Sequence, residues 1–486
     1  MNNQTTILEL SNSVDSLWIS VSTYLVFFMQ AGFAFLEAGT VRERSVQNIL
    51  IKNMLDICAC TIAWWLIGYG FAYGESWNGL IGSSKFVGYN FEGTSEYRDW
   101  MFQWAFAGTA ATIVSGSLAE RTQLLAYVFF SIFMTAFIYP VVVHLTWGGG
   151  ILSGMGYLDF AGSGIVHLVG GTAGHIGSTI IGPRLNRYSY IDDNRHELFK
   201  PHNVPMVVLG TLILWFGWYG FNCGSALGAT GENEKLISLI GMNTTLGASM
   251  GGLVCFIYNA LTSKNKRNRY NVTPLTNGIL AGLVAITAGC NNVEPWAATL
   301  IGGIGGLIYI KTSEFNNYVH LDDPLDAHPI HGASGFWGIF AVGLFDRSKG
   351  FLYGHGVRQI SVQFSSGLII ILWTFITSWC VFKFLHENDM LRITREEELE
   401  GIDRVEHGGV AYHIGENREI EAMSENVVNN NEENSKEEDN NIENNNEDNI
   451  NTEEITISDR NDNINNNNIN NKIIPVEEER IPNEVK

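Results

Sequence analysis

The stretch Asp159–Gly182, "DFAGSGIVHLVGGTAGHIGSTIIG", is the part of this sequence that is most informative about its fold. After Asp159 it carries no formal charge, and it is about as long as the roughly 20 apolar residues that a helix needs to cross a bilayer. It nevertheless holds His167 and His175 inside its apolar run. The stretch therefore predicts a membrane-spanning helix with a carboxylate at its beginning and an imidazole further in.

Apolar segments of this length recur throughout the first 386 residues. We predict eleven spans, at about 17–38, 51–73, 100–119, 123–146, 161–182, 203–228, 236–262, 275–291, 296–312, 331–345 and 357–385. The expected fold class is an all-α polytopic membrane protein with eleven transmembrane helices. Its six cysteines all fall within predicted spans, which argues against a disulfide framework.

The formal net charge of −21 lies almost entirely in the last hundred residues. Residues 387–486 hold 28 acidic and 9 basic side chains, whereas residues 1–386 hold 22 and 20. From about residue 415 the chain is mainly Asn, Glu and Asp, a composition that buries too little apolar surface to offset the entropy of ordering. We therefore expect four regions: an extracellular N-terminus (1–16), the helical domain (17–385), a cytosolic segment (386–414) and a disordered tail (415–486).

Orientation is predicted from the lysines and arginines of the short loops, because positive charge is retained on the cytosolic side. Loops that follow odd-numbered spans hold thirteen such residues, and loops that follow even-numbered spans hold six. The N-terminus is thus expected outside the cell or in a lumen, and the C-terminus in the cytosol. The membrane is the cell membrane or an endomembrane. In the cytosolic segment, Thr394 and Glu397 have the spacing of a capping box, and Gly401 can end the short helix.

Two predicted spans look like copies of one another. The pattern is an Asp, then a His, then a Gly four residues later: Asp159, His167 and Gly171 in one span, and Asp326, His331 and Gly335 in the other. Five spans separate the copies, so the two halves would enter the membrane in opposite directions. This arrangement is typical of transporters built from inverted five-helix repeats, whose pathway lies at the repeat interface.

Ionisable groups inside a membrane cost about 2.5–3.5 kcal/mol when charged, and they often mark functional sites. Histidine is a special case because its neutral ring can still donate and accept a proton. His167 and His331 are therefore candidates to line a path. The spacing equally allows two buried histidines that bond backbone carbonyls, and for His144, His175 and His328 a structural role is favoured.

Residues near the predicted outer surface also admit two interpretations. Asp159 can cap the helix that follows it and can attract a cation. Trp147 is either an interface anchor or an indole that holds a small cation with about 2 kcal/mol. Phe106 and Phe221 are either core residues or a gate, and Ser225 is either a packing hydroxyl or a ligand. Composition alone leaves each pair of interpretations open.

Taken together, several motifs resemble the ammonium transporter superfamily of Amt, Mep and Rh proteins, and most closely its plant-type Amt branch. The resemblance covers about Leu17–Tyr412 and rests on "QAGFAFLEAGTVRERSVQNILIKNMLD", "FQWAFAGTAATIVSGSLAERTQ", "DFAGSGIVHLVGGTAG", "LWFGWYGFNCGSA", "NGILAGLVAITAGCNNVEPWAA", "DDPLDAHPIHG" and "LRITREEELEGIDRVEHGGVAY". It implies an eleven-helix bundle of two inverted five-helix repeats, assembled as a homotrimer with one pore in each subunit.

The resemblance also implies roles for the candidate residues. Phe106 and Phe221 would form the gate at the outer mouth. Trp147, Ser225, Phe106 and Asp159 would recruit the substrate, and His167 and His331 would line the pore below. The cytosolic segment would act as a regulatory helix.

The function implied is transmembrane transport of ammonium, with methylammonium as an analogue. External ammonium would be recruited through cation–π and hydrogen-bond contacts and deprotonated, and ammonia would pass a hydrophobic pore with net charge movement. No enzymatic activity, cofactor, metal or nucleic-acid partner is expected; the partners are the substrate, the lipid bilayer and identical subunits. The main alternative is an ammonium sensor that signals through the tail. A gas channel of the Rh kind and an intramembrane hydrolase are further alternatives.

Two positions depart from the pattern of the branch. His328 stands where a small residue is usual, three positions before His331, so the choice of His331 depends on the match of "HG". Val405 stands where plant-type members often carry a threonine, so phosphorylation cannot operate at that position.

Overall fold

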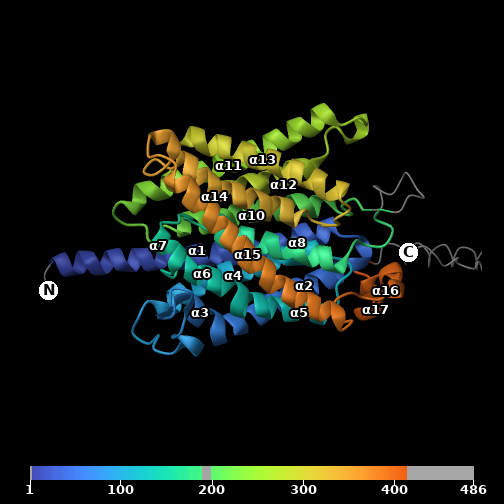
Figure 1. The fold of residues 1–486 in the computed structure, drawn as a ribbon, viewed down its shortest axis with the longest axis horizontal. Helices are drawn as coiled ribbons and strands as arrows, with labels where there is room; N and C mark the ends of the chain where they lie inside the picture. Colours follow the sequence, from blue (N-terminus) through green and yellow to red (C-terminus); the bar gives the residue numbers. More distant parts are fainter. Residues whose placement is uncertain (1–2, 189–198, 413–486) are drawn as a thin grey trace, which may run out of the picture. The chain divides into compact units, whose positions relative to one another are not determined.

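The computed structural model describes residues 3–188 and 199–412, in which helices pack side by side and two short strands pair in a sheet (Figure 1). The predicted tail at 415–486 lies outside the described residues. The elements of the first half are α1 (Asn3–Thr40), η1 (Glu43–Ser45), α2 (Val46–Ala63), η2 (Trp64–Gly68), α3 (Tyr69–Tyr73), β1 (Ser76–Trp77), β2 (Ile81–Gly82), η3 (Phe86–Gly88), α4 (Glu96–Leu118), α5 (Leu124–Phe133), η4 (Met134–Ile138), α6 (Tyr139–Leu145), α7 (Ile151–Met155), η5 (Ser163–Leu168) and α8 (Val169–Ile181).

The second half continues the helical pattern. Its elements are α10 (Val204–Gly224), α11 (Asn233–Thr262), η6 (Lys266–Asn268), α12 (Val272–Ile286), α13 (Pro295–Tyr318), η7 (His328–Ala333), α14 (Ser334–Phe345), η8 (Phe351–Tyr353), α15 (Arg358–Glu387), α16 (Arg395–Glu400) and α17 (Ile402–Glu406). Asparagines cap two of these helices: the side chain of Asn203 accepts from the backbone N–H of Met206, and that of Asn271 accepts from Thr273.

A helix or helical run lies at each predicted span. By length and composition alone, six runs in the described ranges can cross a membrane: Thr6–Thr40, Glu43–Tyr73, Leu124–Leu145, Val204–Gly224, Asn233–Thr262 and Arg358–Glu387. The number of eleven crossings stays a prediction. Figure 1 shows α15 running diagonally across the bundle, where it packs on α8 and α14.

Glycines allow the helices to approach closely. A β-carbon added at Gly251 of α11 would overlap the carbonyl oxygen of Gly278 in α12, and one at Gly302 of α13 would overlap the carbonyl oxygen of Gly247. Such contacts bring backbones together where lipid provides no water exclusion to drive association. The glycine-rich composition thus produces a densely packed bundle.

Among residues 3–188 and 199–412, four stretches have the wider π-helical turn: η2, η4, η5 and η7. Each is continuous with an α-helix, so the run keeps its direction while side chains at the turn are rotated relative to a regular helix. Wider turns of this kind occur frequently at functional sites. His167 lies in η5 and His331 lies in η7.

Buried ion pairs tie together the loops at the Thr40 end of α1. Arg184 pairs with Glu120 at 2.6 Å and with Asp322 at 2.8 Å, and Arg42 also pairs with Glu120. Burial alone would raise the pKa of Asp322, but the charge and hydrogen bonds of Arg184 outweigh it and lower that pKa. The pKa of the Glu120 carboxyl is also lowered, because Arg184 and Arg42 outweigh its burial.

The segment after α15 docks at this same end. Thr394 and Glu397 form the predicted capping box of α16, and α16 ends at Gly401. The carboxylate of Asp403 in α17 accepts from the backbone N–H groups of Gln47 and Asn48, at 2.8 Å each, in the first turn of α2. The segment is therefore held against the helical domain by a cap that it supplies to another helix.

Candidate functional site

A line of aromatic rings leads to His167. The ring of Trp147 lies edge-on to Phe106 with centroids 6.0 Å apart, and Phe106 stacks on Phe221 at 4.1 Å. The ring of Phe221 in turn lies 5.4 Å from His167. These residues come from α4, α10, η5 and the loop after α6, so the fold brings together residues far apart in the sequence.

The two histidines of the predicted pair are in direct contact. Nδ1 of His167 lies 3.2 Å from Nδ1 of His331, and the rings are 5.2 Å apart and nearly parallel. A hydrogen bond between these nitrogens requires that one donates and the other accepts, which two neutral rings can do. His167 is fully buried, and no described residue bonds its Nε2. His331, rather than its neighbour His328, is thus the partner of His167.

Two glycines explain how the histidines meet. A β-carbon at Gly171 would overlap the backbone nitrogen of Gly332, next to His331. A β-carbon at Gly335 would lie 2.6 Å from the carbonyl oxygen of Ser163, in the turn that carries His167. Gly171 follows His167 by four residues and allows the turn that holds His331 to approach. Gly335 follows His331 by four residues and allows the turn that holds His167 to approach. The crossing is therefore built from the same pattern in both halves.

Asp159 caps the helix that carries His167, in agreement with its expected structural role. Its two carboxylate oxygens accept four backbone N–H groups at 2.8–3.0 Å, those of Gly162, Ser163, Gly164 and Ile165. Its own carbonyl oxygen accepts from the indole N–H of Trp147 at 2.8 Å. Because backbone donors occupy the carboxylate, Asp159 acts on Trp147 and the helix by positioning them.

Ser225 follows the last residue of α10, four positions after Phe221. Its hydroxyl donates to the carbonyl oxygen of Phe221 at 2.8 Å and is only partly buried. In the described ranges it makes no hydrogen bond with Trp147. A hydroxyl that donates within its own helix still has lone pairs free to accept from a donor such as ammonium.

A half-polar cavity of about 500 Å³ borders the start of the ring line. Trp147 and Asp159 line it together with Asn291 and Asp346, whereas Phe106 and Phe221 do not. The stacked pair is buried, with Phe106 1% and Phe221 0% exposed. The two phenyl rings thus lie between Trp147 and His167 in the ring line and do not border this cavity.

Two further residues touch the histidines and were not anticipated from the sequence. Trp218 stacks on His167 at 5.1 Å, with its indole N–H held by the hydroxyl of Thr287 at 2.9 Å. Phe33 of α1 lies 6.4 Å from the ring of His331. The spacing of three between Trp218 and Phe221, which places both on one face of α10, was the available signal for the first.

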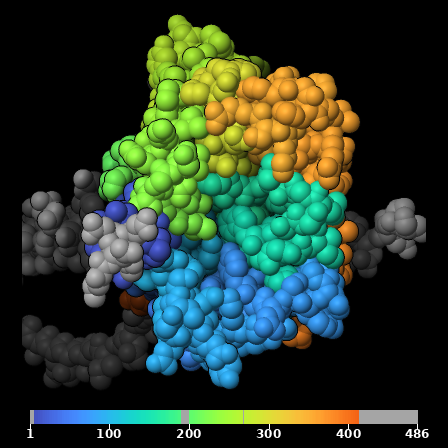
Figure 2. Space-filling model, turned by 90° about the vertical axis from the view of Figure 1, so that its left-hand side faces the viewer, coloured from blue at the N-terminus to red at the C-terminus, as the bar shows by residue number. Residues whose placement is uncertain are grey.

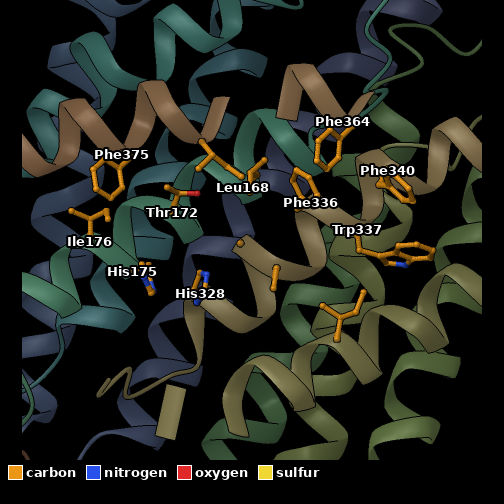
Figure 3. Close-up of a pocket in the computed structure, with 14 residues that line it drawn as sticks. Leu168, Thr172, His175, Ile176, His328, Phe336, Trp337, Phe340, Phe364 and Phe375 are labelled. Carbon is orange, nitrogen blue, oxygen red and sulfur yellow. The ribbon is translucent and has the colours of Figure 1, made fainter. Parts of the chain in front are cut away.

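A second cavity, of about 680 Å³, lies between α8, α13, α14 and α15 (Figure 3). Its walls are mainly apolar and include Phe336, Phe364 and Phe375. His175 and His328 face one another at its edge, with ring centroids 4.3 Å apart. His167 and His331 do not line this cavity. The pair of His175 and His328 therefore lies outside the ring line.

The acid of the second repeat differs from the expected one. Asp326, which the sequence pattern matches to Asp159, accepts from the hydroxyls of Ser313 and Tyr309. It is Asp323 whose carboxylate accepts the backbone N–H of His328 at 2.8 Å, at the start of the turn that holds His331. The cap therefore lies eight residues before the histidine in both halves.

His144 has a structural role, as favoured from the sequence. Its ring nitrogens bond the carbonyl oxygen of Ala72 at 3.0 Å and the hydroxyl of Ser76 at 2.8 Å. Within the described ranges, no three His, Cys, Asp or Glu side chains lie close enough together to hold a metal ion.

Two buried carboxyl groups in the helices were not among the candidate residues predicted from the sequence. Glu37 of α1 accepts from the hydroxyl of Ser115 and, at 2.8 Å, from the amide of Asn53. Asp56 of α2 accepts from the hydroxyls of Thr112 and Ser131. These bonds link α1, α2, α4 and α5 beside the ring line.

Comparison with known proteins places the chain in a family. Residues 17–412 match the model of the Ammonium Transporter Family. "Ammonium transporter 1 member 3" of Solanum lycopersicum is 38% identical over 439 residues, covering 83% of this chain and 94% of that protein. "Ammonium transporter Amt2" of Archaeoglobus fulgidus is 39% identical over 423 residues, covering 82% and 88%.

Solved structures agree with the fold. A structure described as "Sensor Amt Protein" has a TM-score of 0.76 and 33% identity, covering 82% of this chain and 99% of the other. The crystal structure of Saccharomyces cerevisiae Mep2 has a TM-score of 0.72 and 26% identity, covering 79% and 88%. Related proteins are thus named as transporters, not enzymes. With its matching fold, its matching motifs and its apolar helices, this chain is a polytopic helical membrane protein that belongs to the ammonium transporter family.

Proposed function

We propose that this protein transports ammonium across a membrane along the ring line from Trp147 to His331. The observation that carries the proposal is the contact of two buried imidazoles behind a stacked pair of phenyl rings. Membership of the ammonium transporter family supports the same substrate. The path would have Phe106 and Phe221 as its gate.

Recruitment would take place at Trp147. The indole face attracts a cation by about 2 kcal/mol or more once water is excluded. The hydroxyl of Ser225 and the carbonyl oxygens nearby can accept hydrogen bonds from ammonium, which a potassium ion of similar size cannot donate. Asp159 would hold the indole in place through its carbonyl oxygen.

Deprotonation would follow because the space beyond the phenyl pair is apolar. Moving an unpaired charge into such surroundings costs far more than moving a neutral molecule, so ammonia passes more readily than ammonium. The imidazoles of His167 and His331 can accept and pass on a hydrogen-bonded proton without becoming buried cations. An ion that cannot release a proton would be rejected.

The transport proposal can be tested in yeast that lacks its own ammonium transporters. Expression of this chain should restore growth on low ammonium and uptake of labelled methylammonium. If the chain reaches the cell surface but restores neither growth nor uptake, the proposal is contradicted.

Net charge movement is a separate part of the proposal. If the proton released by ammonium follows ammonia along the two imidazoles, one positive charge enters the cell with each ammonia, and ammonium should produce an inward current in oocytes. Uptake without any current would leave an ammonia channel, and the electrogenic form would be withdrawn.

We also propose the finer membrane arrangement: eleven crossings in two inverted repeats, the N-terminus outside, the C-terminal segment in the cytosol, and a homotrimer. The paired turns at His167 and His331 with their matched glycines support the inverted repeats. Labelling of single introduced cysteines from either side of the membrane would test the orientation of each loop.

A sensor is the second candidate. A neighbour in structure is described as "Sensor Amt Protein", and this chain carries an acidic segment after Tyr412. Truncation after Tyr412 should leave methylammonium uptake unchanged for either function. A sensor would lose its ammonium-dependent signal to the cell in the truncated chain, whereas a pure transporter has no such signal to lose.

A further inference from the structure

The cavity between α8, α13, α14 and α15 has no part in the proposed path, and we define it as the lateral cavity. Its volume of about 680 Å³ lies within the roughly 300–1,000 Å³ of pockets that hold a small molecule. Four phenyl rings and one indole line it: Phe336, Trp337, Phe340, Phe364 and Phe375. It therefore has room for one apolar molecule and aromatic faces on which that molecule can pack.

The lateral cavity reaches the outside of the helical bundle. Phe364 and Phe375 of α15 are 45% and 44% exposed, and Leu368 and Leu372 between them are also exposed. Such apolar side chains on the surface of a membrane protein face hydrocarbon, so lipid molecules have access to the cavity. Phe364 and Phe375 are eleven residues apart, about 16 Å along the helix, so the cavity is elongated along α15.

One end of the lateral cavity is polar. His175 of α8 and His328 of η7 face one another there with ring centroids 4.3 Å apart, and Thr172 lies beside them (Figure 3). Within the described ranges, Nδ1 of His175 is buried without a hydrogen-bond partner, and the hydroxyl of the buried Thr172 makes no hydrogen bond. Nδ1 of His328 lies 3.5 Å from the amide nitrogen of Asn316, which is long for a hydrogen bond. This end therefore offers hydrogen-bonding groups that the described residues leave largely unused.

The polar end lies near one end of the bundle. His175 is six residues before the end of α8 at Ile181, about 9 Å along the helix. Arg392, in the segment after α15, donates to the carbonyl oxygen of Ile181 at 2.7 Å. Helix α15 begins at the opposite end of the molecule, which Figure 2 shows with the orange loop before α15 beside the teal segment around α7. The lateral cavity thus runs from a polar end near one membrane boundary into the hydrocarbon.

We propose that the lateral cavity binds one sterol molecule from the membrane, with the sterol hydroxyl at His175 and His328. A sterol joins a rigid apolar ring system to one uncharged hydroxyl, which can donate and accept hydrogen bonds. Neutral imidazoles and the hydroxyl of Thr172 can do the same, so the polar end matches this hydroxyl without any charge. A rigid ring system also loses less conformational freedom on binding than a flexible acyl chain, which favours the sterol.

The lining of the cavity disfavours lipids with charged headgroups. Among the described residues that line it there is no Asp, Glu, Lys or Arg. A phosphate group at the polar end would be buried without a counter-charge, at a high cost in free energy. The site is also independent of transport, because neither His175 nor His328 belongs to the ring line. Failure of either proposal therefore leaves the other intact.

Binding of tritiated cholesterol to the purified full-length protein in detergent tests the proposal. The original chain should bind it saturably, with one sterol for each chain. The double variant His175→Phe and His328→Phe keeps two aromatic rings but removes their hydrogen bonds, so its affinity should fall at least about tenfold. The matched control is His386→Phe, at an exposed histidine of α15 outside the cavity, and it should bind like the original chain.

A second variant fills the cavity and keeps the test decisive if the double variant does not fold. Ala333→Trp, on the cavity wall, should abolish saturable binding, whereas Leu125→Trp, at an exposed position of α5, should not. A cooperative unfolding transition in detergent verifies that each variant is folded. Added cholesterol should raise the unfolding temperature of the original chain and of Leu125→Trp, but not that of Ala333→Trp.

Three results would overturn the proposal. The first is binding that does not saturate, and the second is equal affinity of the original chain and a folded cavity variant. The third is displacement of the labelled cholesterol by diacylglycerol as effectively as by unlabelled cholesterol, which would identify an acyl chain as the occupant.

Discussion

The indole of Trp147 is fixed before any substrate arrives. Its N–H donates to the carbonyl oxygen of Asp159, whose carboxylate holds four backbone N–H groups of the histidine-bearing turn. A side chain held in this way loses little further freedom on binding a cation, so more of the attraction appears as affinity. In the proposed function, Asp159 would support the site without touching the substrate.

Replacing Trp147 tests this role. Trp147→Leu should raise the ammonium concentration for half-maximal current by about thirtyfold, the equivalent of the 2 kcal/mol expected for a desolvated cation–π contact. The maximal current should fall much less. The matched control is Trp296→Leu, because that indole is 49% exposed and packs on Phe345 instead. An unchanged half-maximal concentration for Trp147→Leu would argue against recruitment at the indole.

Sequence reasoning identified the residues of the ring line but not all their neighbours. His167, His331, Phe106 and Phe221 stood in the quoted motifs, and the resemblance also implied a role for Trp147. The structure places these five residues in one continuous line. Their roles in transport stay predictions.

Trp218 and Phe33 were missed because contact with a histidine depends on how three helices cross. Asp323 was missed for a related reason: the cap is defined by the backbone path after α13, and spacing alone favoured Asp326.

The helix elements supply the geometry that brings the histidines together. The turns η5 and η7 rotate His167 and His331 toward each other, and Gly171 and Gly335 remove the atoms that would keep the helices apart. The sequence showed the doubled pattern. It did not show that each half contributes a wider turn, because π-helical geometry arises from packing and has no clear signature in composition.

A single methyl group at this crossing should separate the histidines. Gly171→Ala places its β-carbon on the backbone of Gly332, and only a shift of one helix relieves the overlap. Overpacking of this kind typically costs about 1–3 kcal/mol, so we expect a folded protein whose methylammonium uptake falls at least about tenfold. Gly154→Ala is the control, because nothing lies within 4 Å of its added β-carbon. Equal uptake by the two variants would contradict the proposed crossing.

The buried ion pairs join the loops that connect these elements. Asp322→Asn removes one of the two buried carboxylates that pair with Arg184, while the pair with Glu120 remains. Breaking a buried pair costs about 3–5 kcal/mol, so the variant should unfold at a clearly lower temperature in detergent. Glu314→Gln, which removes an exposed pair with Lys311, should leave that temperature unchanged. If both substitutions lower the unfolding temperature by a similar amount, burial of the Arg184–Asp322 pair does not determine its contribution to stability.

The same pairs make stability dependent on pH in a defined direction. The pKa of Asp322 in the folded protein lies below its ordinary value of about 3.9, because Arg184 outweighs the effect of burial. The pair's contribution is therefore complete above about pH 4 and disappears as the pH falls through the lowered folded pKa. The difference in unfolding temperature between the original chain and Asp322→Asn should shrink below that pH. A difference that stays constant down to pH 2 would contradict the assignment.

In the whole molecule, helix α1 continues to Asn3, well before the predicted span of 17–38 begins. Near its start the hydroxyl of Ser11 bonds that of Thr230, and the carboxylate of Asp15 accepts from the backbone N–H groups of Ala229 and Thr230. The polar residues before Leu17 concealed this continuation, because they interrupt the apolar run from which the span was predicted.

The docked segment after α15 completes the described part of the molecule. The capping box at Thr394 was predictable because its pattern is local. The bond of Asp403 to the first turn of α2 was not, because it joins residues more than 350 positions apart. Local patterns in the sequence therefore predicted helices and caps, and the structure was needed to show which of them meet.

In the proposed path, two neutral imidazoles in apolar surroundings admit only a substrate that can release its proton. Currents of ammonium and potassium in oocytes test this selection in the double variant His167→Ala and His331→Ala, with His386→Ala, an exposed histidine of α15, as the control. We expect the double variant to lose selective ammonium current or to admit potassium, while the control behaves like the original chain. Ammonium currents and exclusion of potassium that survive in the double variant at equal surface abundance would contradict it.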